Sequence, residues 1–248
     1  MAKTALVTGA AAGIGRACAR RLAREGIQVG VLDLDRVAAQ TVVDEISADG
    51  GTALALGASI ADRPAIEAAV SALRDAFGPV TIVVNNAGIS KFLAFEDITD
   101  ELWDEQFEIN AKGTFIVTQT VLPDMKAAKW GRIVNISSSS AQTGSPDQVH
   151  YSASKGAMIS MTRSLAVALG PFGITVNNIP PGSVMQTVMS EANKDKWPIS
   201  EERIAKMLPV RRTGVPDDIA NACAWLVSED TGYVTGQTLG VNGGRVIT

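Results

Sequence analysis

The stretch that decides the fold of this chain is Thr4-Ala5-Leu6-Val7-Thr8-Gly9-Ala10-Ala11-Ala12-Gly13-Ile14-Gly15. It starts as a short apolar run of strand-like composition, turns through glycines spaced Gly-x-x-x-Gly-x-Gly, and is followed by a helix-like segment. Glycines let the backbone turn tightly and approach a phosphate group, whose charge then faces the N-terminus of the helix. The stretch therefore predicts a strand, a phosphate-binding turn and a helix in direct succession.

The same alternation continues along the whole chain. Strand-length apolar runs separated by helical stretches are typical of a parallel sheet covered by helices on both faces. We expect strands at 4–8, 28–33, 52–56, 82–85, 132–136, 175–179 and 238–241. We expect helices near 14–25, 35–49, 63–77, 100–127, 151–169 and 216–228. The pattern predicts an α/β fold: one Rossmann-type domain over residues 1–248 with a doubly wound, seven-stranded parallel sheet.

Composition limits the classes of function. The net charge is −4 and no basic run occurs, so we expect no nucleic-acid partner. No apolar run exceeds strand length, so we expect no membrane partner. Cys18 and Cys223 are far apart and His150 is the only histidine, so we expect neither a metal site nor a disulfide framework, and a Ser-His-Asp hydrolase is hard to build. We interpret His150 as a partly buried spacer or a pocket wall.

The early first strand leaves no room for a signal peptide, and we expect a reducing, cytoplasmic location.

Asp33 ends the second expected strand. A carboxylate at that point can accept hydrogen bonds from the ribose hydroxyls of a dinucleotide and would repel a 2′-phosphate. Leu34 follows it, and Ala12 occupies the other position where a basic residue would help to bind such a phosphate. These residues favour NAD over NADP. The alternative is that Asp33 caps the next helix, although Asp35 is better placed for that role.

Tyr151 and Lys155 are four residues apart in a stretch expected to be helical, which places them on one face, one turn apart. A nearby ammonium group favours the phenolate, so we expect the pKa of Tyr151 to fall from about 10 toward neutrality. Such a tyrosine can carry protons at physiological pH. By itself, the pair also fits an ordinary solvated helix face.

Several motifs together make the resemblance specific. The chain resembles the short-chain dehydrogenase/reductase family along nearly its whole length. The matching segments, in the order and spacing of that family, are Thr8–Gly15, Asn85-Asn86-Ala87-Gly88, Asn110, Ser138, Tyr151-x-x-x-Lys155, Pro181-Gly182, Val234-Thr235-Gly236-Gln237 and Val241-Asn242-Gly243-Gly244.

The resemblance implies a catalytic role for each of four residues. Tyr151 would exchange a proton with the substrate oxygen, and Lys155 would lower the pKa of Tyr151 and bind the nicotinamide ribose. Ser138 would hold the substrate oxygen, and Asn110 would support Lys155 through a water molecule. Ser140 could also point into the pocket, because alternate residues of an extended segment share a face.

The resemblance and the strand ends also give the expected binding residues. The cofactor would contact Gly9, Ala12, Gly13, Ile14, Gly15, Asp33, Leu34, Ser59, Ile60, Asn86, Ala87, Gly88, Tyr151, Lys155, Pro181, Gly182, Val184 and Thr187. The substrate would contact Ser138, Ser140, Gln148, Tyr151, Met185 and Met189. Two positions depart from the family pattern. Ser59 stands where an acidic residue often contacts adenine, and Gln186 stands where a threonine often contacts the carboxamide, so either Gln186 or Thr187 would do so.

Residues 183–210 interrupt the regular alternation and are rich in Met, Lys, Asp and Glu. We interpret this segment as a substrate lid, or alternatively as an ordinary surface excursion. Its residues Val184, Met185, Val188, Met189 and Trp197 favour an apolar or aromatic-bearing substrate. The resemblance also implies a homotetramer, with Phe107, Phe115, Val117, Met158 and Met161 as candidate contacts between subunits.

The preferred function is therefore an oxidoreductase that transfers hydride between NAD(H) and a secondary alcohol or ketone. One alternative is a 3-oxoacyl-carrier-protein or 3-oxoacyl-CoA reductase that uses NADP(H). A remote alternative is a nucleotide-binding sensor without turnover, against which the complete set of Asn110, Ser138, Tyr151 and Lys155 argues.

Overall fold

The computed structural model describes residues 3–192 and 199–247. In these residues one parallel sheet contains six strands in the order β3-β2-β1-β4-β5-β6. The strands are β1 (Thr4–Thr8), β2 (Gln28–Asp33), β3 (Ala53–Gly57), β4 (Val80–Asn85), β5 (Gly131–Ile136) and β6 (Ile174–Ile179). The reversal of strand order occurs beside β1, which pairs with both β2 and β4. In such sheets ligands bind outside the carboxyl ends of the strands at this switch point.

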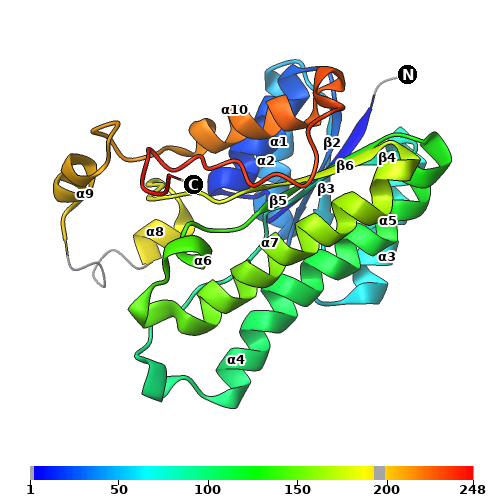
Figure 1. The fold of residues 1–248 in the computed structure, drawn as a ribbon. Coiled ribbons are helices and arrows are strands. Elements are labelled where there is room, and N and C mark those ends of the chain that lie inside the picture. The colour runs from blue at the N-terminus through cyan, green and yellow to red at the C-terminus, as the bar shows by residue number, and fades with distance from the viewer. Residues whose placement is uncertain (1–2, 193–198, 248) are drawn as a thin grey trace.

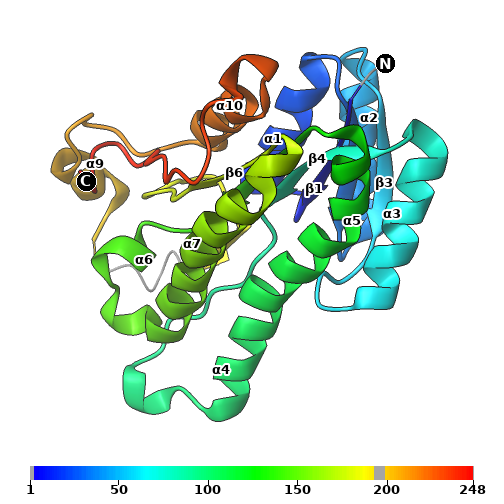
Figure 2. The same cartoon turned by 45° about the vertical axis from the view of Figure 1, so that its right-hand side comes forward.

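Helices cover both faces of the sheet (Figures 1 and 2). They are α1 (Gly13–Arg24), α2 (Arg36–Ala48), α3 (Arg63–Phe77), α4 (Asp100–Phe107), α5 (Thr114–Ala128), α6 (Ser140–Thr143), α7 (Val149–Leu169), α8 (Val188–Ala192), α9 (Glu201–Met207) and α10 (Pro216–Val227). The short 3₁₀ segments are η1 (Phe95–Asp97), η3 (Pro146–Gln148), η4 (Gly170–Phe172) and η6 (Glu229–Thr231). Helices α1, α2 and α10 lie on one face, and α3, α5 and α7 lie on the other.

The two faces have separate apolar cores, and β1 shows how one strand serves both. Ala5 and Val7 pack with α1, α2 and α10, whereas Leu6 between them packs with α3, α5 and α7. All three side chains are completely buried. A strand with both faces covered needs apolar residues at every position, which is why the sequence reads as a continuous apolar run.

The prediction of a seventh strand at 238–241 is wrong. Residues 235–239 run beside β6, but the pairing is reduced to a single bridge between Asn178 and Thr238. Gly236 has a φ of +72°, which bends the chain out of extended geometry. Next to it, the side chain of Asn177 donates to the carbonyl of Val234, where a regular ladder would use main-chain groups. This segment is therefore an irregular edge.

The expected helix at 100–127 is divided. A π-helical segment, η2 (Glu108–Gly113), separates α4 from α5. Single turns of π-helix are rare and often occur at functional sites. This turn carries Asn110, which is fully buried, so the irregularity coincides with a residue expected to be functional.

The expected lid at 183–210 contains α8 and α9. Val184 forms an isolated bridge with Gly214, which ties the beginning of the segment to the residues before α10. Trp197 lies outside the described residues. Of the candidate subunit contacts, Val117 and Met158 are completely buried within the chain, so they cannot face a partner. In residues 3–192 and 199–247, no helix combines the length and hydropathy needed to cross a membrane.

Candidate active site

The glycine-rich turn between β1 and α1 is held tightly against the end of β4. Gly9 and Gly13 have φ values of +62° and +52°, a region that disfavours side chains. A Cβ on Gly9 would lie 2.8 Å from the Cα of Ala87, and one on Gly15 would lie 2.1 Å from the carbonyl oxygen of Gly9. The amide of Asn86 donates to that same oxygen at 3.0 Å. The turn therefore requires glycine at these positions.

The beginning of α1 is open to an anion. The N-cap residue Ala12 offers no side-chain acceptor, and the first turn carries no acidic residue. The main-chain N–H groups of the first helical turn have no partner within the helix, and the positive end of the helix dipole lies there too. Ala12, Gly13 and Ile14 all line the cavity described below. A pyrophosphate fits this cradle.

Asp33 is fixed at the end of β2. Its Oδ2 accepts the N–H of Ala11 at 3.0 Å, and its Oδ1 accepts the N–H of Asp35 at 3.3 Å. Asp35 caps α2, because its carboxylate accepts the N–H groups of Val37 and Ala38. The capping alternative for Asp33 is therefore wrong, and its carboxylate lines the cavity beside the glycine-rich turn.

Ser138 and Tyr151 meet above the end of β5. The hydroxyl and the N–H of Ser140 both donate to Ser138 Oγ, at 2.9 and 3.2 Å, so the hydroxyl proton of Ser138 is left to donate elsewhere. Tyr151 is 7% exposed. Burial raises the pKa of Tyr151, and its hydrogen bond with Ser138 acts in the opposite direction. Ser140 thus orients Ser138, and Ser138 favours the phenolate.

Lys155 lies one turn further along α7, as its spacing predicts. Its ammonium donates to the carbonyl of Ile136 at 2.9 Å and lies 6.0 Å from the ring centroid of Tyr151. Burial lowers the pKa of Lys155 to about 8. The expected fall in the pKa of Tyr151 is not seen, because burial of the phenol outweighs the influences that favour its charged form.

Asn110 lies behind Lys155 and does not line the cavity. Its amide donates to the carbonyl of Ile89 and to Ser154 Oγ, both at 3.0 Å, and its Oδ1 accepts the N–H of Ile89 at 2.9 Å. A Cβ on Gly88 would lie 2.9 Å from Asn110 Oδ1 and 3.2 Å from Lys155 Nζ. Both groups therefore border the space beside Gly88, which a side chain at that position would occupy.

One cavity of about 770 Å³ joins the two ends of the site. The expected residues that line it are Gly9, Ala12, Gly13, Ile14, Asp33, Leu34, Ser59, Ile60, Asn86, Ala87, Gly88, Ser138, Ser140, Gln148, Tyr151, Lys155, Pro181, Gly182, Val184, Thr187 and Met189. Gly15 and Met185 do not line it. Gly15 is buried against Gly9, and the main chain of Met185 is bound to the carbonyl of Gly214.

The end of the cavity beside Ser138 and Tyr151, where a substrate is expected and which is called the substrate end below, is built from side chains of separate segments. Gln148 donates to Ser90 Oγ at 2.6 Å and accepts from Ser145. Thr187 lines the cavity against Gly13, whereas Gln186 is exposed and lies outside the lining. Sequence reasoning missed Ile89, Phe92, Ser145 and Arg245, which also line the cavity. Their positions depend on tertiary folding, and no motif signals them.

His150 is completely buried and does not line the cavity. Neither ring nitrogen has a hydrogen-bond partner among the described residues. Burial lowers the pKa of His150, and the charge of Lys91 adds to that effect. The pocket-wall interpretation is therefore wrong, and the neutral ring acts as a spacer that is more deeply buried than expected. Among the described residues no group of His, Cys, Asp or Glu is arranged to hold a metal ion.

Comparison with known proteins agrees with this geometry. The family model described as enoyl-(acyl carrier protein) reductase matches residues 9–245. A subunit of (2S)-[(R)-hydroxy(phenyl)methyl]succinyl-CoA dehydrogenase from Thauera aromatica is 40% identical over 98% of this chain and 96% of its own. L-rhamnose 1-dehydrogenase (NAD(P)(+)) from Azotobacter vinelandii is 41% identical over 99% of this chain and 97% of its own.

Two further relatives are reductases. A 3-oxoacyl-[acyl-carrier-protein] reductase of Staphylococcus aureus is 38% identical, with 98% of each chain covered. The crystal structure of an actinorhodin polyketide ketoreductase variant with NADPH superposes with a TM-score of 0.92, at 37% identity over 98% of this chain and 97% of that one. With Ser138, Tyr151 and Lys155 gathered at the open end of a doubly wound sheet, these matches show that the chain belongs to the short-chain dehydrogenase/reductase family.

Proposed function

We propose that this protein transfers hydride between NAD(H) and a secondary alcohol or its ketone. The observation that carries the proposal is the shared cavity: Ser138, Tyr151 and Lys155 line the same space as the glycine-rich turn and Asp33. A dinucleotide lying along that cavity would bring its nicotinamide end to the hydroxyl groups of Ser138 and Tyr151. When bound, NAD supplies the hydride acceptor and NADH the donor.

The residues present fit such a cofactor. The backbone of Gly9 and Gly13 can form the turn because neither residue carries a side chain, and the first turn of α1 offers unpartnered N–H groups to the pyrophosphate. Asp33 would hold the adenosine ribose, and Ser59 and Ile60 would contact the adenine. The segment 181–184 would enclose the nicotinamide end. Thr187, which lines the cavity, is the better candidate than Gln186 for the carboxamide.

The protein's own groups would handle the proton. In the reductive direction, Ser138 donates a hydrogen bond to the carbonyl oxygen and Tyr151 delivers the proton to it. The ammonium of Lys155, whose pKa is about 8, carries its charge at neutral pH and stabilises the phenolate that remains. Asn110 would act as a positioning residue for Lys155, because its side-chain oxygen and Lys155 Nζ border the same space beside Gly88.

The proton-transfer role of Tyr151 is tested by Tyr151→Phe. We expect turnover to fall by roughly 10²–10⁴ while NAD binding, measured by fluorescence titration, stays nearly unchanged. The chain offers a matched control in Tyr233→Phe, because Tyr233 is its only other tyrosine and is fully exposed. Unchanged turnover in the Tyr151 variant would rule out the proton-transfer role.

The choice of NAD rests on the Asp33 carboxylate, which would repel a 2′-phosphate. The competing proposal is a 3-oxoacyl-carrier-protein or 3-oxoacyl-CoA reductase that uses NADP(H), supported by the similarity to the Staphylococcus aureus reductase and to a ketoreductase crystallised with NADPH. The ratio of kcat/KM for NADH and NADPH separates the two. A strong preference for NADPH would overturn the assignment of NAD.

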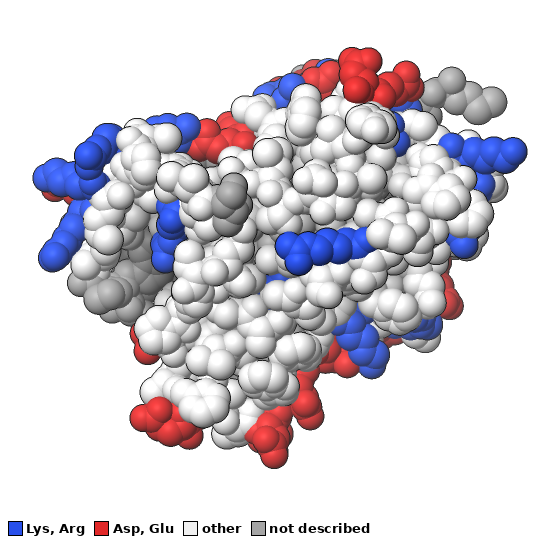
Figure 3. Space-filling model, viewed as in Figure 1, with Lys and Arg blue, Asp and Glu red and all other residues white. Residues whose placement is uncertain are grey.

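We also propose that residues 183–210 form the substrate lid and that the protein is a homotetramer. Val188 and Met189 on α8 are exposed to solvent on one side and line the cavity on the other. The face over α5 and α7 is largely uncharged (Figure 3), and Phe115 on α5 is 45% exposed. Phe107, which stacks on Trp103, and Met161 are partly buried and remain candidate contacts. Light scattering in solution tests the oligomeric state.

A further inference from the structure

Arg245 is a charged residue at the substrate end that the mechanism above does not use. Gly243 and Gly244 have φ values of +65° and +81°, and the resulting turn is closed by the N–H of Arg245, which donates to the carbonyl of Asn242 at 3.1 Å. The turn sends the Arg245 side chain back toward the cavity, where Nη1 donates to Ser183 Oγ at 3.2 Å. Two consecutive left-handed glycines are therefore what place this guanidinium at the cavity.

This turn is packed onto the strand end beside the reacting groups. The carbonyl of Pro181 accepts the N–H of Ser139 at 2.9 Å, so the segment that continues to Ser183 runs next to Ser138. A Cβ on Gly182 would lie 3.0 Å from the Cα of Asn242, which fixes the turn against that segment. Arg245 thus lies on the substrate side of the cavity, close to the segment that bounds the reacting centre.

The charges along the cavity differ at its two ends. Its charged lining residues within the described chain are Asp33, Asp35, Lys155 and Arg245. The two acids belong to the adenosine end, where β2 leads into α2. Among the described residues Arg245 forms no ion pair, and its side chain makes one hydrogen bond, to Ser183. The remaining N–H groups of its planar fork are free to bind an anion in two-point fashion.

The rest of the substrate end combines apolar and uncharged polar side chains. Phe92, Val188 and Met189 line it together with Ser140, Ser145 and Gln148. A pocket with an apolar patch and one cation at its rim selects a molecule with an apolar body and one negative group. Arginine binds both carboxylate and phosphate in two-point fashion, and a single guanidinium matches the single charge of a carboxylate better than the roughly doubled charge of a phosphate ester.

We infer that Arg245 binds a carboxylate of the substrate, so that the substrates are hydroxy acids and keto acids whose carboxylate is separated from the reacting carbon by a short apolar chain. This inference rests on the proposed oxidoreductase function, and it names the substrate class for that site. Binding through Arg245 holds the substrate at the end opposite to its reacting oxygen, which orients that oxygen toward Ser138 and Tyr151.

The test compares acids with their uncharged esters. The probes are 4-oxopentanoate, 5-oxohexanoate and their methyl esters, with the cofactor that gives the higher rate. We expect the unmodified enzyme to prefer each acid, and Arg245→Gln to lower kcat/KM for the acids about 10–100-fold, mainly through KM, with the esters changed less than about threefold. Arg245→Lys should retain part of the preference because it keeps the charge without the fork. Arg163→Gln removes another exposed arginine that has no ion pair among the described residues. This variant should change kcat/KM neither for the acids nor for the esters.

Binding measured by calorimetry separates this inference from the proposed function. The NAD-saturated protein should bind 4-oxopentanoate, and Arg245→Gln should weaken that binding about tenfold or more. If no ketone is reduced but this binding difference is found, the proposed function fails and the carboxylate site stands. Equal use of acids and esters by the unmodified enzyme would overturn the inference. Weaker NAD binding in Arg245→Gln would overturn it too. So would a loss of 4-oxopentanoate binding in Ser183→Ala as large as that in Arg245→Gln, because Ser183→Ala keeps the cation.

Discussion

The adenosine end and the substrate end of the cavity are built in different ways. The adenosine end is fixed by the main chain: the turn at Gly9 and Gly13 has no room for side chains, and the Asp33 carboxylate is held by two N–H groups. The substrate end is made of side chains, such as Met189 and Arg245, that come from separate segments. Requirements of the main chain restrict the sequence strongly, whereas a side-chain pocket can be filled in many ways. The sequence therefore indicates the class of reaction, but it does not identify the substrate.

The largest expected effect tests the main-chain requirement. Gly15→Ala places a Cβ 2.1 Å from the carbonyl oxygen of Gly9, a backbone atom that cannot move without displacing the turn. We expect a loss of at least about 3 kcal/mol in the free energy of unfolding, together with loss of NAD binding. Denaturant titration and fluorescence titration measure the two quantities.

A glycine outside the turn supplies the control. Gly156→Ala on α7 adds a Cβ with nothing within 4 Å, so it should stabilise the protein by about 0.5–1 kcal/mol through helix propensity. Similar costs for Gly15→Ala and Gly156→Ala would mean that the turn is not constrained as the geometry indicates, and the contrast between the two ends would lose its basis.

The same distinction explains what could be predicted from the sequence. The strands β1 and β2 were predicted with their observed bounds, because burial on both faces requires an apolar run that is visible in the sequence. Ser138, Tyr151 and Lys155 were predicted to meet, and all three line the cavity. The segment at 238–241 failed as a strand, because the bend at Gly236 is decided by tertiary contacts with Asn177 rather than by local composition.

Two features of the site could not be predicted. The burial that raises the pKa of Tyr151 is a property of the assembled pocket, and helical spacing alone reports only the neighbouring ammonium. Arg245 comes to the cavity because a turn reverses the chain after Asn242 and lays it against Gly182, which lies far away in sequence. Neither effect has a local pattern by which it could be recognised.

The second prediction concerns Lys155, which lies between the two ends. Its pKa is lowered from 10.5 to about 8. Burying the charged ammonium near neutral pH therefore lowers the free energy of unfolding. Lys155→Met removes that buried charge but leaves the carbonyl of Ile136 without its donor. We expect turnover to fall by roughly 10² or more, while the free energy of unfolding at neutral pH rises by about 1–2 kcal/mol.

The pH dependence of stability checks the cause of that gain. Between about pH 8 and 10.5 the unfolded chain holds the Lys155 proton to a greater extent than the folded protein does. The free energy of unfolding of the unmodified protein therefore rises with pH across that window. The gain of Lys155→Met over the unmodified protein should therefore shrink across the same window, measured by denaturant titration. A gain that is independent of pH would show that packing, not the buried charge, is responsible.

The third prediction concerns cofactor choice at the adenosine end. Asp33→Asn keeps the size and one acceptor oxygen but removes the negative charge, so the kcat/KM ratio for NADH over NADPH should fall about 10-fold or more. Asp35→Asn is the matched control: it removes a charge two residues away and keeps a good helix cap. Equal changes in both variants would indicate a general field effect rather than contact with the ribose.

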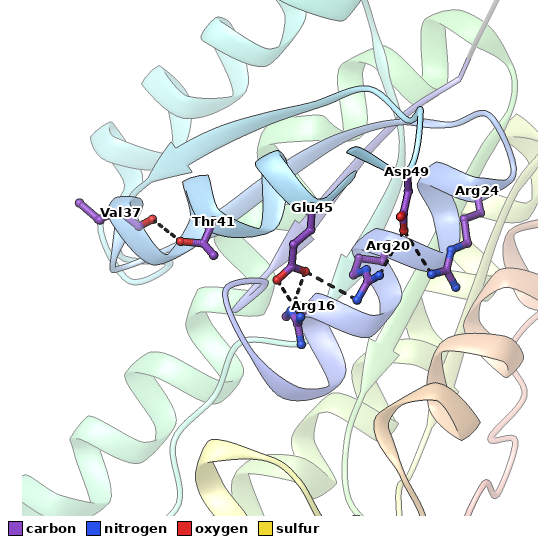
Figure 4. Close-up of polar contacts among 7 residues, drawn as sticks. All are labelled: Arg16, Arg20, Arg24, Val37, Thr41, Glu45 and Asp49. Atoms are coloured by element: carbon purple, nitrogen blue, oxygen red, sulfur yellow. Dashed lines mark hydrogen bonds and ion pairs between the residues drawn. The ribbon is translucent and has the colours of Figure 1, made fainter. Parts of the chain in front are cut away.

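The smallest effect concerns the ion pairs behind the adenosine end. Figure 4 shows how α1 is tied to α2: Arg16 binds Glu45 through two hydrogen bonds of 2.7 and 2.9 Å, Arg20 lies 3.7 Å from Glu45, and Asp49 lies 3.1 Å from Arg20 and 3.3 Å from Arg24. Glu45→Gln should lower the free energy of unfolding by about 0.5–1 kcal/mol at low salt, because a two-point, networked pair exceeds an ordinary surface pair. The loss should shrink by about half or more in 1 M salt, where the Debye length is about 3 Å.

The control comes from the expected lid. Glu202→Gln breaks a pair with Lys206 on α9, in which both side chains are more than 70% exposed. A single-contact pair within one helix contributes only about 0.3–0.5 kcal/mol, so the Glu45 variant should lose more. A double-mutant cycle between Arg16 and Glu45 isolates the pair itself. If the two pairs prove equal, the rigidity of the adenosine end comes from its backbone and packing alone, because the ion pairs across α1 and α2 would then add no more than any exposed pair on the surface.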